Sequence, residues 1–244
     1  MLQRRIGADA RIVVLTGAGI SAESGLPTFR GPDGLWEGRR FEEVATPEAF
    51  AADPESVHRF YNHRRRQLRD PAVQPNPAHL ALAELERRWP GEVRVVTQNV
   101  DDLHERAGQR TVLHLHGQLD RVRCVRCGWS GRWEVDLGTI HACPGCNAAG
   151  QLRPDIVWFG ETPKAMEEVE DALEVCDLFI AIGTSGNVYP AAGFVETVRS
   201  SSLAHTVEIN LAESLVSSRF EERRFGKASE EVPRFVAELL AVHA

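Results

Sequence analysis

Short apolar runs alternate with amphipathic segments along most of the chain. Six runs have the length and composition of buried strands, at 11–16, 93–97, 111–115, 155–159, 178–182 and 206–209. Between them, apolar residues recur at helical spacing, which predicts helices over 54–69, 77–88, 164–176, 190–199 and 230–242. Apolar strands that alternate with helices are typical of a parallel sheet covered on both faces. The pattern therefore predicts an α/β fold with a doubly wound, mostly parallel sheet.

Two stretches interrupt this alternation. Residues 25–76 begin as a loop and continue as a helix, and residues 120–153 carry most of the cysteines. We interpret the two stretches as insertions that together build a small lobe. The expected organisation is one domain with a large lobe of residues 1–35, 77–119 and 154–244, and a small lobe of residues 36–76 and 120–153.

Composition and charge exclude several classes of protein. With 244 residues and 43% hydrophobic side chains, the chain is long enough for a large buried core. The net charge of −7 disfavours general nucleic-acid binding, which needs a basic field. The apolar runs are far shorter than the roughly 20 residues that span a bilayer, so we expect no membrane segment. The first residues lack the apolar stretch of a signal peptide, and we therefore predict a cytoplasmic location.

Four of the five cysteines form two close pairs. Two residues separate Cys124 from Cys127 and Cys143 from Cys146, and fifteen residues separate the pairs. This spacing is typical of a zinc ribbon, in which four thiolates surround the ion and leave no position for water. We therefore predict one structural zinc ion. Cys176 precedes an apolar run, and we interpret it as a small buried side chain.

The first strand leads into the glycine-rich turn Gly17-Ala18-Gly19 and then into a predicted helix. Glycines let a pyrophosphate approach the backbone, and a helix N-terminus offers N–H groups to it. The acidic residue that dehydrogenases carry about 20 residues later is missing. The turn thus favours nucleotide binding outside the usual dehydrogenase arrangement. A tight turn without a ligand is the alternative interpretation.

Polar side chains follow two other predicted strands. Gln98, Asn99 and Asp101 follow the strand at 93–97, and His116 follows the strand at 111–115. Polar groups at the carboxyl ends of parallel strands face the crevice where ligands bind. A cap on the next helix is the alternative for Asn99 and Asp101. His116 is a candidate general base with His114 as its rival, and a purely structural histidine is the alternative.

The helix predicted over 54–69 carries one arginine on its apolar face. Val57, Phe60, Tyr61, Arg64 and Leu68 recur at helical spacing. A buried guanidinium needs an anionic partner, and Tyr61 and Arg64 lie one turn apart, so both side chains can hold one carboxylate. The alternative is that Arg64 extends into solvent.

These motifs stand together in one order. From its amino end the chain carries GAGISAESGLPTFRGPDGLW, TQNVDDLHERAG, LHLHGQL, the four cysteines, IVWFGE, GTSGNVYPAAGF and VEINL. Together they resemble the sirtuins, which are NAD-dependent protein-lysine deacylases, over about residues 11–240. Ala45 in ATPEAF and the run from Tyr61 to Arg64 resemble the class III branch, of the bacterial CobB type.

The resemblance implies a Rossmann-like large lobe, and a small lobe made of a helical insertion and a zinc ribbon. NAD and acyl-lysine would meet between them. The residues expected around NAD, the co-substrate, are Gly17, Ala18, Gly19, Ile20, Ala22, Thr28, Phe29, Arg30, Trp36, Gln98, Asn99, Val100, Asp101, His116, Gly183, Thr184, Ser185, Asn210, Leu211, Ala212 and Ala228. The residues expected around the acyl-lysine and its peptide, which would add as a strand, are Ala45, Tyr61, Arg64, Val157, Phe159, Gly160, Glu161, Asn187, Val188 and Tyr189.

The resemblance also implies the catalytic roles of His116, Asn99 and Asp101. Gln98 and Asn99 would hold the nicotinamide ribose, and Asp101 would hold the carboxamide. The acyl oxygen attacks the ribose C1′ as nicotinamide leaves. His116 then deprotonates a ribose hydroxyl, which attacks the resulting imidate carbon, and water completes the reaction. The products are free lysine and O-acyl-ADP-ribose. A histidine suits this role because its ordinary pKa of about 6.5 lies near the working pH.

The residues of the small lobe lead to an expectation about which acyl groups are removed. If Tyr61 and Arg64 line the acyl channel, they pair with the carboxylate of succinyl- or malonyl-lysine, and the small Ala45 leaves room for it. We expect removal of acetyl groups as well, and a monomeric protein. Two alternatives are a mono-ADP-ribosyltransferase with the same NAD pocket and a non-catalytic zinc-ribbon protein that senses NAD.

Overall fold

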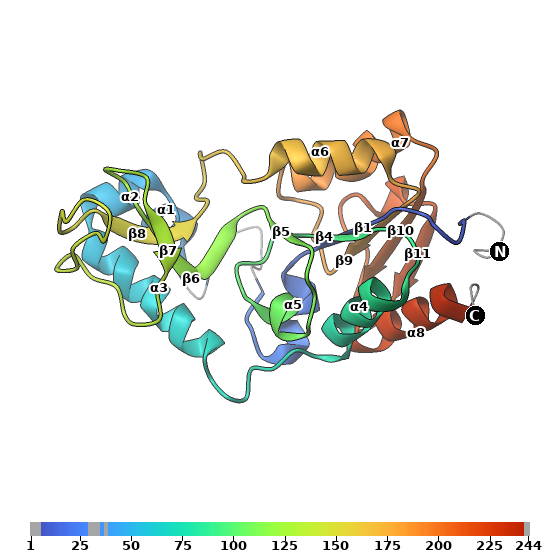
Figure 1. Ribbon diagram of the computed structural model, residues 1–244, viewed down its shortest axis with the longest axis horizontal. Helices are drawn as coiled ribbons and strands as arrows, with labels where there is room; N and C mark the ends of the chain where they lie inside the picture. Colours follow the sequence, from blue (N-terminus) through green and yellow to red (C-terminus); the bar gives the residue numbers. More distant parts are fainter. Residues whose placement is uncertain (1–5, 29–34, 37–38, 242–244) are drawn as a thin grey trace.

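A six-stranded parallel sheet forms the larger of two parts of the molecule (Figure 1). The computed structural model describes residues 6–28, 35–36 and 39–241. In the order β11-β10-β9-β1-β4-β5, all neighbouring strands are parallel. The strands are β1 (Ile12–Thr16), β4 (Val93–Thr97), β5 (Val112–His114), β9 (Leu178–Ile182), β10 (His205–Asn210) and β11 (Glu222–Phe225).

Two pairs of helices cover the two faces of this sheet. Ile12 and Val14 of β1 belong to the core beneath α4 (Pro77–Arg88) and α8 (Ala228–Ala241). Val13 and Leu15 belong to the core beneath α6 (Met166–Val175) and α7 (Phe194–Ser201). Because successive strand residues point to opposite faces, an unbroken apolar run serves both cores. The predicted doubly wound α/β fold is confirmed.

The smaller part contains a three-stranded antiparallel sheet in the order β7-β6-β8. Its strands are β6 (Gly117–Cys124), β7 (Ser130–Arg132) and β8 (Leu152–Ile156). The strand expected at 155–159 is therefore shifted toward the amino end and lies in this sheet. An apolar run indicates that a strand is buried, but it does not indicate to which sheet the strand belongs. Ile156 of β8 packs with α3, and Leu152 packs with the cysteine module. The small sheet thus extends beyond the expected stretch 120–153 at both ends.

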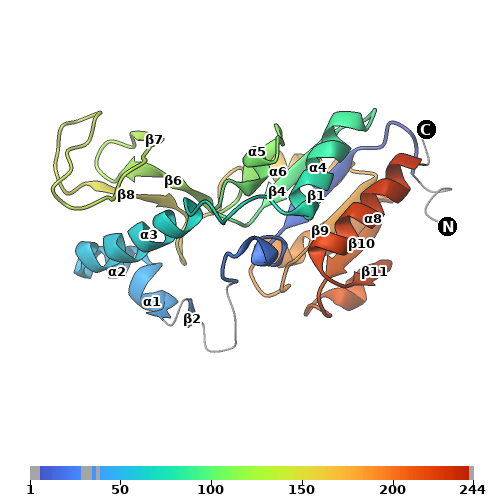
Figure 2. The same ribbon diagram turned by 90° about the horizontal axis from the view of Figure 1, so that it is seen from below.

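Among the described residues, two short strands and three helices complete the smaller part (Figure 2). The elements are β2 (Leu35–Trp36), β3 (Arg39–Arg40), α1 (Phe41–Val44), α2 (Pro47–Ala52) and α3 (Pro54–Leu68). Asp53 caps α3 by accepting a hydrogen bond from the Ser56 N–H at 2.9 Å, and Pro54 occupies the first turn. Val57 and Tyr61 of α3 pack with Leu119 of β6 and Ile156 of β8 in one core. This packing ties the helical insertion to the small sheet.

The strand order changes direction at β1. From β1 the chain passes to β4 and β5 on one side, then returns to β9, β10 and β11 on the other. Such a reversal opens a crevice at the carboxyl ends of the strands. The smaller part faces this crevice because β6 follows β5 directly along the chain.

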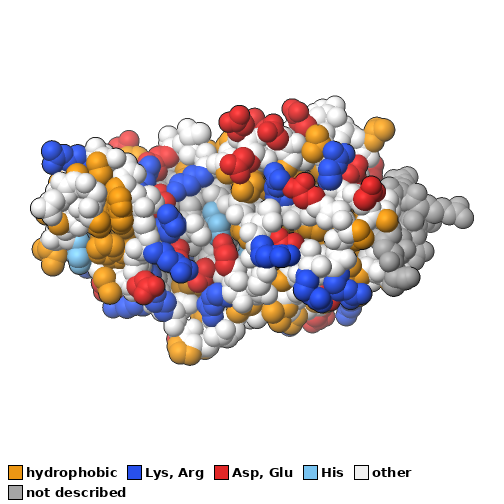
Figure 3. All heavy atoms as spheres, viewed as in Figure 1, with side chains coloured by type: hydrophobic (Ala, Val, Ile, Leu, Met, Phe, Trp, Pro, Cys, Tyr) orange, Lys and Arg blue, Asp and Glu red, His pale blue; other side chains and the backbone are white. Residues whose placement is uncertain are grey.

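Charged side chains are unevenly distributed over the molecule. Acidic groups gather around α6 on the face shown in Figure 3, where the sequence places Glu167, Glu168, Glu170, Asp171 and Glu174. Elsewhere on that face, acidic and basic side chains are mixed. In the described part of the chain, no helix combines the length and apolar character that crossing a membrane requires.

Acid is expected to destabilise the fold partly through His58. Its imidazole is buried in α3 against Phe50, and neither ring nitrogen has a hydrogen-bond partner among the described residues. Burial lowers the pKa of His58 to about 4. Between pH 6.5 and pH 4 the unfolded chain therefore binds a proton that the folded chain does not. Stability is expected to fall as pH falls through this window, by on the order of 2 kcal/mol for this group.

Urea unfolding at several pH values tests this contribution. His58→Leu should flatten the loss of stability between pH 6.5 and pH 4.5 relative to the wild type. His63→Leu is the matched control, because His63 is exposed on the same helix. An equally steep pH dependence in His58→Leu would contradict the assignment.

Candidate functional site

A cleft of about 600 Å³ lies between the two parts. Residues that follow β1, β4, β9 and β10 form one wall, and α3 together with the segment after β8 forms the other. Most of the expected site residues line this cleft, namely Gly17, Ala18, Gly19, Thr28, Ala45, Tyr61, Arg64, Gln98, Asn99, Val100, Asp101, His116, Val157, Phe159, Gly160, Glu161, Gly183, Thr184, Ser185, Val188, Tyr189, Asn210, Leu211 and Ala212. Residues far apart in the sequence therefore share one cavity.

The glycine turn after β1 packs directly against the turn after β9. A Cβ atom on Gly17 would lie 2.8 Å from the carbonyl oxygen of Gly183, and one on Gly19 would lie 2.6 Å from the Cα of Gly183. Gly183 itself has a φ of +62°, which L side chains rarely adopt. The glycines are thus required for the approach of these two turns, which form the floor of the cleft.

The helix expected after the glycine turn is absent. Two single 3-10 turns, η2 (Ala18–Ile20) and η3 (Ala22–Ser24), occupy its place and end at Gly25, whose φ is +88°. The N–H groups of Gly19 and Ile20 donate to the carbonyls of Gly183 and Gly17. The expected helix N-terminus with several free N–H groups is therefore not formed, because the segment lacks a continuous apolar helical face.

Four expected site residues do not line the cleft. The Ile20 side chain is buried in the core beneath α4 and α8, and Ala228 packs at the edge of that core. Ala22 and Asn187 are exposed to solvent outside the cleft wall. The resemblance implied a site role for these residues, but the side chains of Ile20 and Ala228 pack in the core.

Three further expected residues fall in a segment that the structure describes only in part. Phe29 and Arg30 lie outside the described residues. The backbone of Trp36 belongs to β2, and its side chain lies outside the description.

A buried hydrogen-bond network supports the polar residues after β4. The Asn99 amide donates to the Gly17 carbonyl at 3.2 Å and to the Ser21 hydroxyl at 3.1 Å. The Ser21 hydroxyl donates to the Asp101 carboxylate at 3.0 Å, and the other carboxylate oxygen accepts the Leu103 N–H at 3.1 Å. Burial raises the pKa of Asp101, although these hydrogen bonds oppose the shift. Asp101 therefore both initiates the turn into α5 (Leu103–Arg106) and lines the cleft.

The two candidate histidines have different environments. His114 Nε2 lies 2.7 Å from the Glu105 carboxylate and its Nδ1 lies 3.1 Å from the Asn99 carbonyl oxygen. Burial lowers the pKa of His114, but the hydrogen bond to Glu105 and the charge of Glu105 outweigh it, so the net shift is upward. Because both ring nitrogens face acceptors, the protonated form of His114 is favoured, and the side chain does not line the cleft.

His116 lines the cleft and has one nitrogen available as a base. Its Nδ1 lies 3.0 Å from the Gln98 carbonyl oxygen, and because a carbonyl can only accept, Nδ1 carries the hydrogen. The unprotonated nitrogen of the neutral ring is then Nε2. Burial lowers the pKa of His116, and the bond to Gln98 opposes this. The neutral, proton-accepting form is thus favoured near pH 7.

Tyr61, Arg64 and Ala45 lie together on the wall that the small part provides. Tyr61 and Arg64 are buried on the side of α3 that faces the cleft, and Ala45 is buried after α1. The Ala45 carbonyl accepts the Phe159 N–H at 3.0 Å. These residues come from separate segments, and this bond connects two of the segments.

The segment after β8 is braced by Glu161. Its carboxylate accepts two hydrogen bonds from Arg153, at 2.8 and 2.9 Å, and one from the Trp158 N–H at 2.8 Å. Arg123 adds a further ion pair. Glu161, which was expected to contact substrate, therefore directs its carboxylate into the protein.

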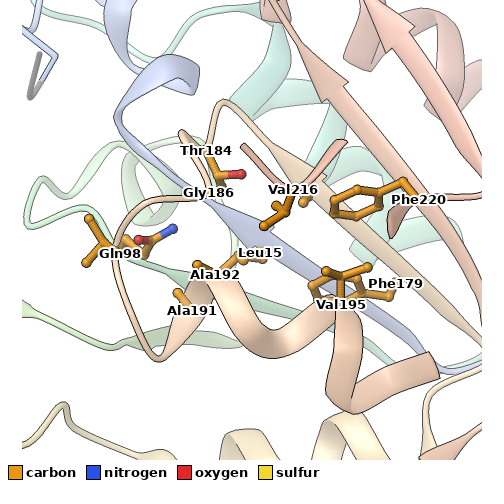
Figure 4. A pocket seen from close by; sticks show the side chains of 12 residues that line it. Leu15, Gln98, Phe179, Thr184, Gly186, Ala191, Ala192, Val195, Val216 and Phe220 are labelled. Atoms are coloured by element: carbon orange, nitrogen blue, oxygen red, sulfur yellow. The ribbon is translucent and has the colours of Figure 1, made fainter. Parts of the chain in front are cut away.

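A second, much smaller cavity of about 10 Å³ adjoins the cleft (Figure 4). Gln98, Thr184 and Val188 border both cavities. Apolar side chains such as Phe179 and Val195 form its remaining walls. A space of this size holds at most one water molecule, so it is too small for an organic ligand.

The four paired cysteines converge at the end of the smaller part. Their sulfur atoms all lie within 4.8 Å of one another; the distances are 3.8 Å for Cys124 and Cys146, and 3.7 Å for Cys127 and Cys143. Tetrahedral zinc with Zn–S bonds of about 2.3 Å requires sulfurs about 3.8 Å apart. The geometry fits one structural zinc ion that has no open position.

The fifth cysteine, Cys176, does not belong to this cluster and lies in the core of the larger part. Cys176 is 2% exposed and directs its thiol toward the Leu173 carbonyl at 3.4 Å. Burial raises its pKa to about 11. The interpretation of Cys176 as a small buried side chain is confirmed.

Several cleft residues were not expected from the sequence. They line the wall although none was named as a site residue: Ser21, Leu26, Pro27, Gln67, Leu68, Leu119, Ile156, Trp158, Pro163, Glu213, Ser214 and Leu215. Helical spacing offered a signal for Leu68, which lies one turn after Arg64. For Trp158 the signal was its place in the motif IVWFGE, between the expected residues Val157 and Phe159.

Comparison with known proteins gives consistent matches. A profile of the Sir2 family matches residues 17–190. An NAD-dependent protein deacylase of Bdellovibrio bacteriovorus is 58% identical over 229 residues, which cover 94% of this chain and 96% of that protein. An NAD-dependent protein deacylase of Vibrio cholerae is 55% identical over 233 residues, which cover 96% of this chain and 94% of that protein.

Solved structures give the same match in three dimensions. A Sir2 homolog–NAD complex has a TM-score of 0.85 at 42% identity, and the match covers 98% of this chain and 94% of the other. A Sir2–p53 peptide–NAD+ complex has a TM-score of 0.78 at 33% identity, and the match covers 93% of this chain and 92% of the other.

Proposed function

Because the chain belongs to the Sir2 family, we propose that it removes acyl groups from protein lysines in an NAD-dependent reaction. Nicotinamide and O-acyl-ADP-ribose are released. The observation that carries the proposal is the single cleft that joins the glycine turns, the polar residues after β4, and His116. Relatives that are more than half identical are named NAD-dependent protein deacylases.

NAD fits the large-lobe wall of the cleft. The contacts between Gly17, Gly19 and Gly183 leave no room for side chains on the floor, so a dinucleotide can approach the backbone there. NAD supplies the ribose carbon that accepts the acyl oxygen, and it is consumed. Asn99 and Asp101, fixed through Ser21, hold the nicotinamide end.

His116 acts as the general base. Its Nδ1–H is fixed by the Gln98 carbonyl, so Nε2 takes the proton of a ribose hydroxyl. His114 is excluded from this role because it is ion-paired with Glu105 away from the cleft. Zinc takes no part in the chemistry, since four thiolates occupy its coordination positions.

The acyl groups removed include the acidic succinyl and malonyl groups as well as acetyl. Arg64 and Tyr61 offer a guanidinium and a hydroxyl to a carboxylate in a buried part of the cleft wall. Ala45 leaves space beside them. Acetyl-lysine fits the same channel without using the charged contact.

Replacing Arg64 tests the acyl preference. With one peptide in acetyl-, succinyl- and malonyl-lysine forms, Arg64→Met is expected to lower removal of the acidic groups by about a hundredfold and to leave acetyl removal within a few-fold. The reason is that a carboxylate left in the buried channel without its cation loses its main partner. Mass spectrometry with and without NAD measures all three reactions.

Arg66→Met is the matched control, since Arg66 is exposed on the same helix. It should leave all three reactions unchanged. Equal loss of the three reactions in Arg64→Met would refute the carboxylate assignment. Appearance of ADP-ribose on protein, with no acyl loss in the wild type, would favour the mono-ADP-ribosyltransferase instead.

The substrates we propose are acyl-lysine proteins and peptides. The Val157 N–H donates to the His116 carbonyl, which links the proposed peptide-binding segment to the base. A cytoplasmic location, a monomeric state and the division into lobes at the boundaries given above stay predictions.

A further inference from the structure

Trp158 lies between the proposed acyl site and a buried ion pair. Its indole is 2% exposed, lines the cleft, and donates its Nε1–H to the Tyr61 phenolic oxygen at 2.8 Å. The two rings lie 6.2 Å apart between centroids. Tyr61, which is fully buried, thus receives a hydrogen bond from a residue that the expected site did not include.

The direction of this bond determines what Tyr61 offers a ligand. An indole N–H can only donate, so the phenolic oxygen accepts and the phenol's own hydrogen is oriented as a donor. Burial also raises the pKa of Tyr61, which keeps that hydrogen in place. A carboxylate can only accept, so it can bind such a hydroxyl, and the Arg64 guanidinium on the same wall favours its negative charge.

The indole is held in this position from its other face. The Arg153 guanidinium lies 3.2 Å from the centroid of the Trp158 ring and is 3% exposed. It is fixed by both oxygens of Glu161 and donates to the Ile156 carbonyl at 2.8 Å. The backbone N–H of Trp158 donates to the same Glu161 carboxylate. Stacking and ion pairing therefore leave the indole one orientation.

We propose that Trp158, braced by Arg153 and Glu161, is a positioning residue that sets the Tyr61 hydroxyl as a hydrogen-bond donor for acidic acyl groups. This inference rests on the proposed deacylase function and deepens it, because it adds a determinant of acyl class beyond Tyr61 and Arg64. Acetyl-lysine carries no carboxylate, so it gains nothing from the orientation. Trp158 therefore affects the choice between acyl groups and leaves the chemical step alone.

The test compares one peptide in succinyl- and acetyl-lysine forms. Trp158→Phe keeps an aromatic ring and removes the N–H. It is expected to raise KM for the succinyl peptide roughly fivefold relative to KM for the acetyl peptide, as for one lost hydrogen bond. In a Tyr61→Phe background, Trp158→Phe should add no further loss, because the hydroxyl that it positions is already absent.

Trp133→Phe is the matched control. Trp133 lies in the cysteine module, and its indole nitrogen has no hydrogen-bond partner among the described residues. It should change neither KM. Arg153→Lys provides a second variant, which weakens the brace and keeps the indole. It should raise the succinyl KM more than the acetyl KM.

Equal increases of both KM values in Trp158→Phe and Arg153→Lys, or additive losses with Tyr61→Phe, would overturn the proposal and assign Trp158 a purely structural role. Failure of the proposed function looks different. In that case the wild type itself removes no acyl group from either peptide, before any variant is compared.

Discussion

Replacing His116 with alanine is expected to lower NAD-dependent deacylation by about a hundredfold to ten-thousandfold. The loss follows because Nε2 of His116 is the basic nitrogen that the cleft presents, with Nδ1 fixed by the Gln98 carbonyl. Binding of NAD and the thermal midpoint should change little, since the side chain is only half-buried. Single-turnover assays with one acetylated peptide measure the chemical step directly.

The pH profile gives a second readout of the same group. A general base must be neutral, and burial lowers the pKa of His116. Activity in the wild type should therefore persist as pH falls through 6.5 and be lost only at lower pH. His114→Gln is the matched control two residues away. It breaks the ion pair with Glu105 and should reduce stability while keeping kcat within about tenfold. Full activity of His116→Ala would show that another group takes the proton.

Removal of zinc is expected to unfold the cysteine module and to abolish deacylation. Structural zinc contributes on the order of 10–16 kcal/mol in isolated zinc fingers, which is comparable to the whole stability of a typical domain. The core around the cysteines is small and consists mainly of Val122, Leu137 and Leu152 besides the cysteines themselves. Metal analysis should find one zinc ion per chain, and a chelator should expose four thiols together with loss of activity.

The contacts of α3 explain why activity depends on this distant module. The Asn62 amide donates to the Leu137 carbonyl and accepts the Leu137 N–H, both at 2.8 Å. Arg65 donates to the Leu119 carbonyl at 3.0 Å. The helix that carries Tyr61 is thus attached to the zinc-bearing sheet, so unfolding of that sheet releases it.

Cysteine variants separate the metal ligands from the fifth cysteine. Cys127→Ser should lose zinc and behave as the chelated protein does. Cys176→Ala should keep one zinc ion and near-normal activity, because Cys176 is buried beneath α6 and lies outside the cluster. Retention of stoichiometric zinc by Cys127→Ser would refute the four-cysteine site.

Features that depend on local spacing were predictable from the sequence. The helices over 54–69 and 77–88 correspond to α3 and α4, because apolar periodicity and a proline in the first turn act within the segment. The four cysteines were identifiable as zinc ligands for the same reason. Five strands of the large sheet followed from apolar runs, since a strand buried on both faces has no polar side. The sixth, β11, was not predicted, because its sequence ERRF is not an apolar run.

The tertiary structure alone decided the relations between distant segments. It placed β8 in the small sheet and formed 3-10 turns where a helix was expected after Gly19. It also gave His114 a carboxylate partner, Glu105, and His116 only the Gln98 carbonyl. It also joined Trp158 to Tyr61 across 97 positions of sequence. Periodicity and spacing indicate which side chains of a segment are buried. Which side chain meets which depends on how the two parts pack, and that packing is a property of the whole chain.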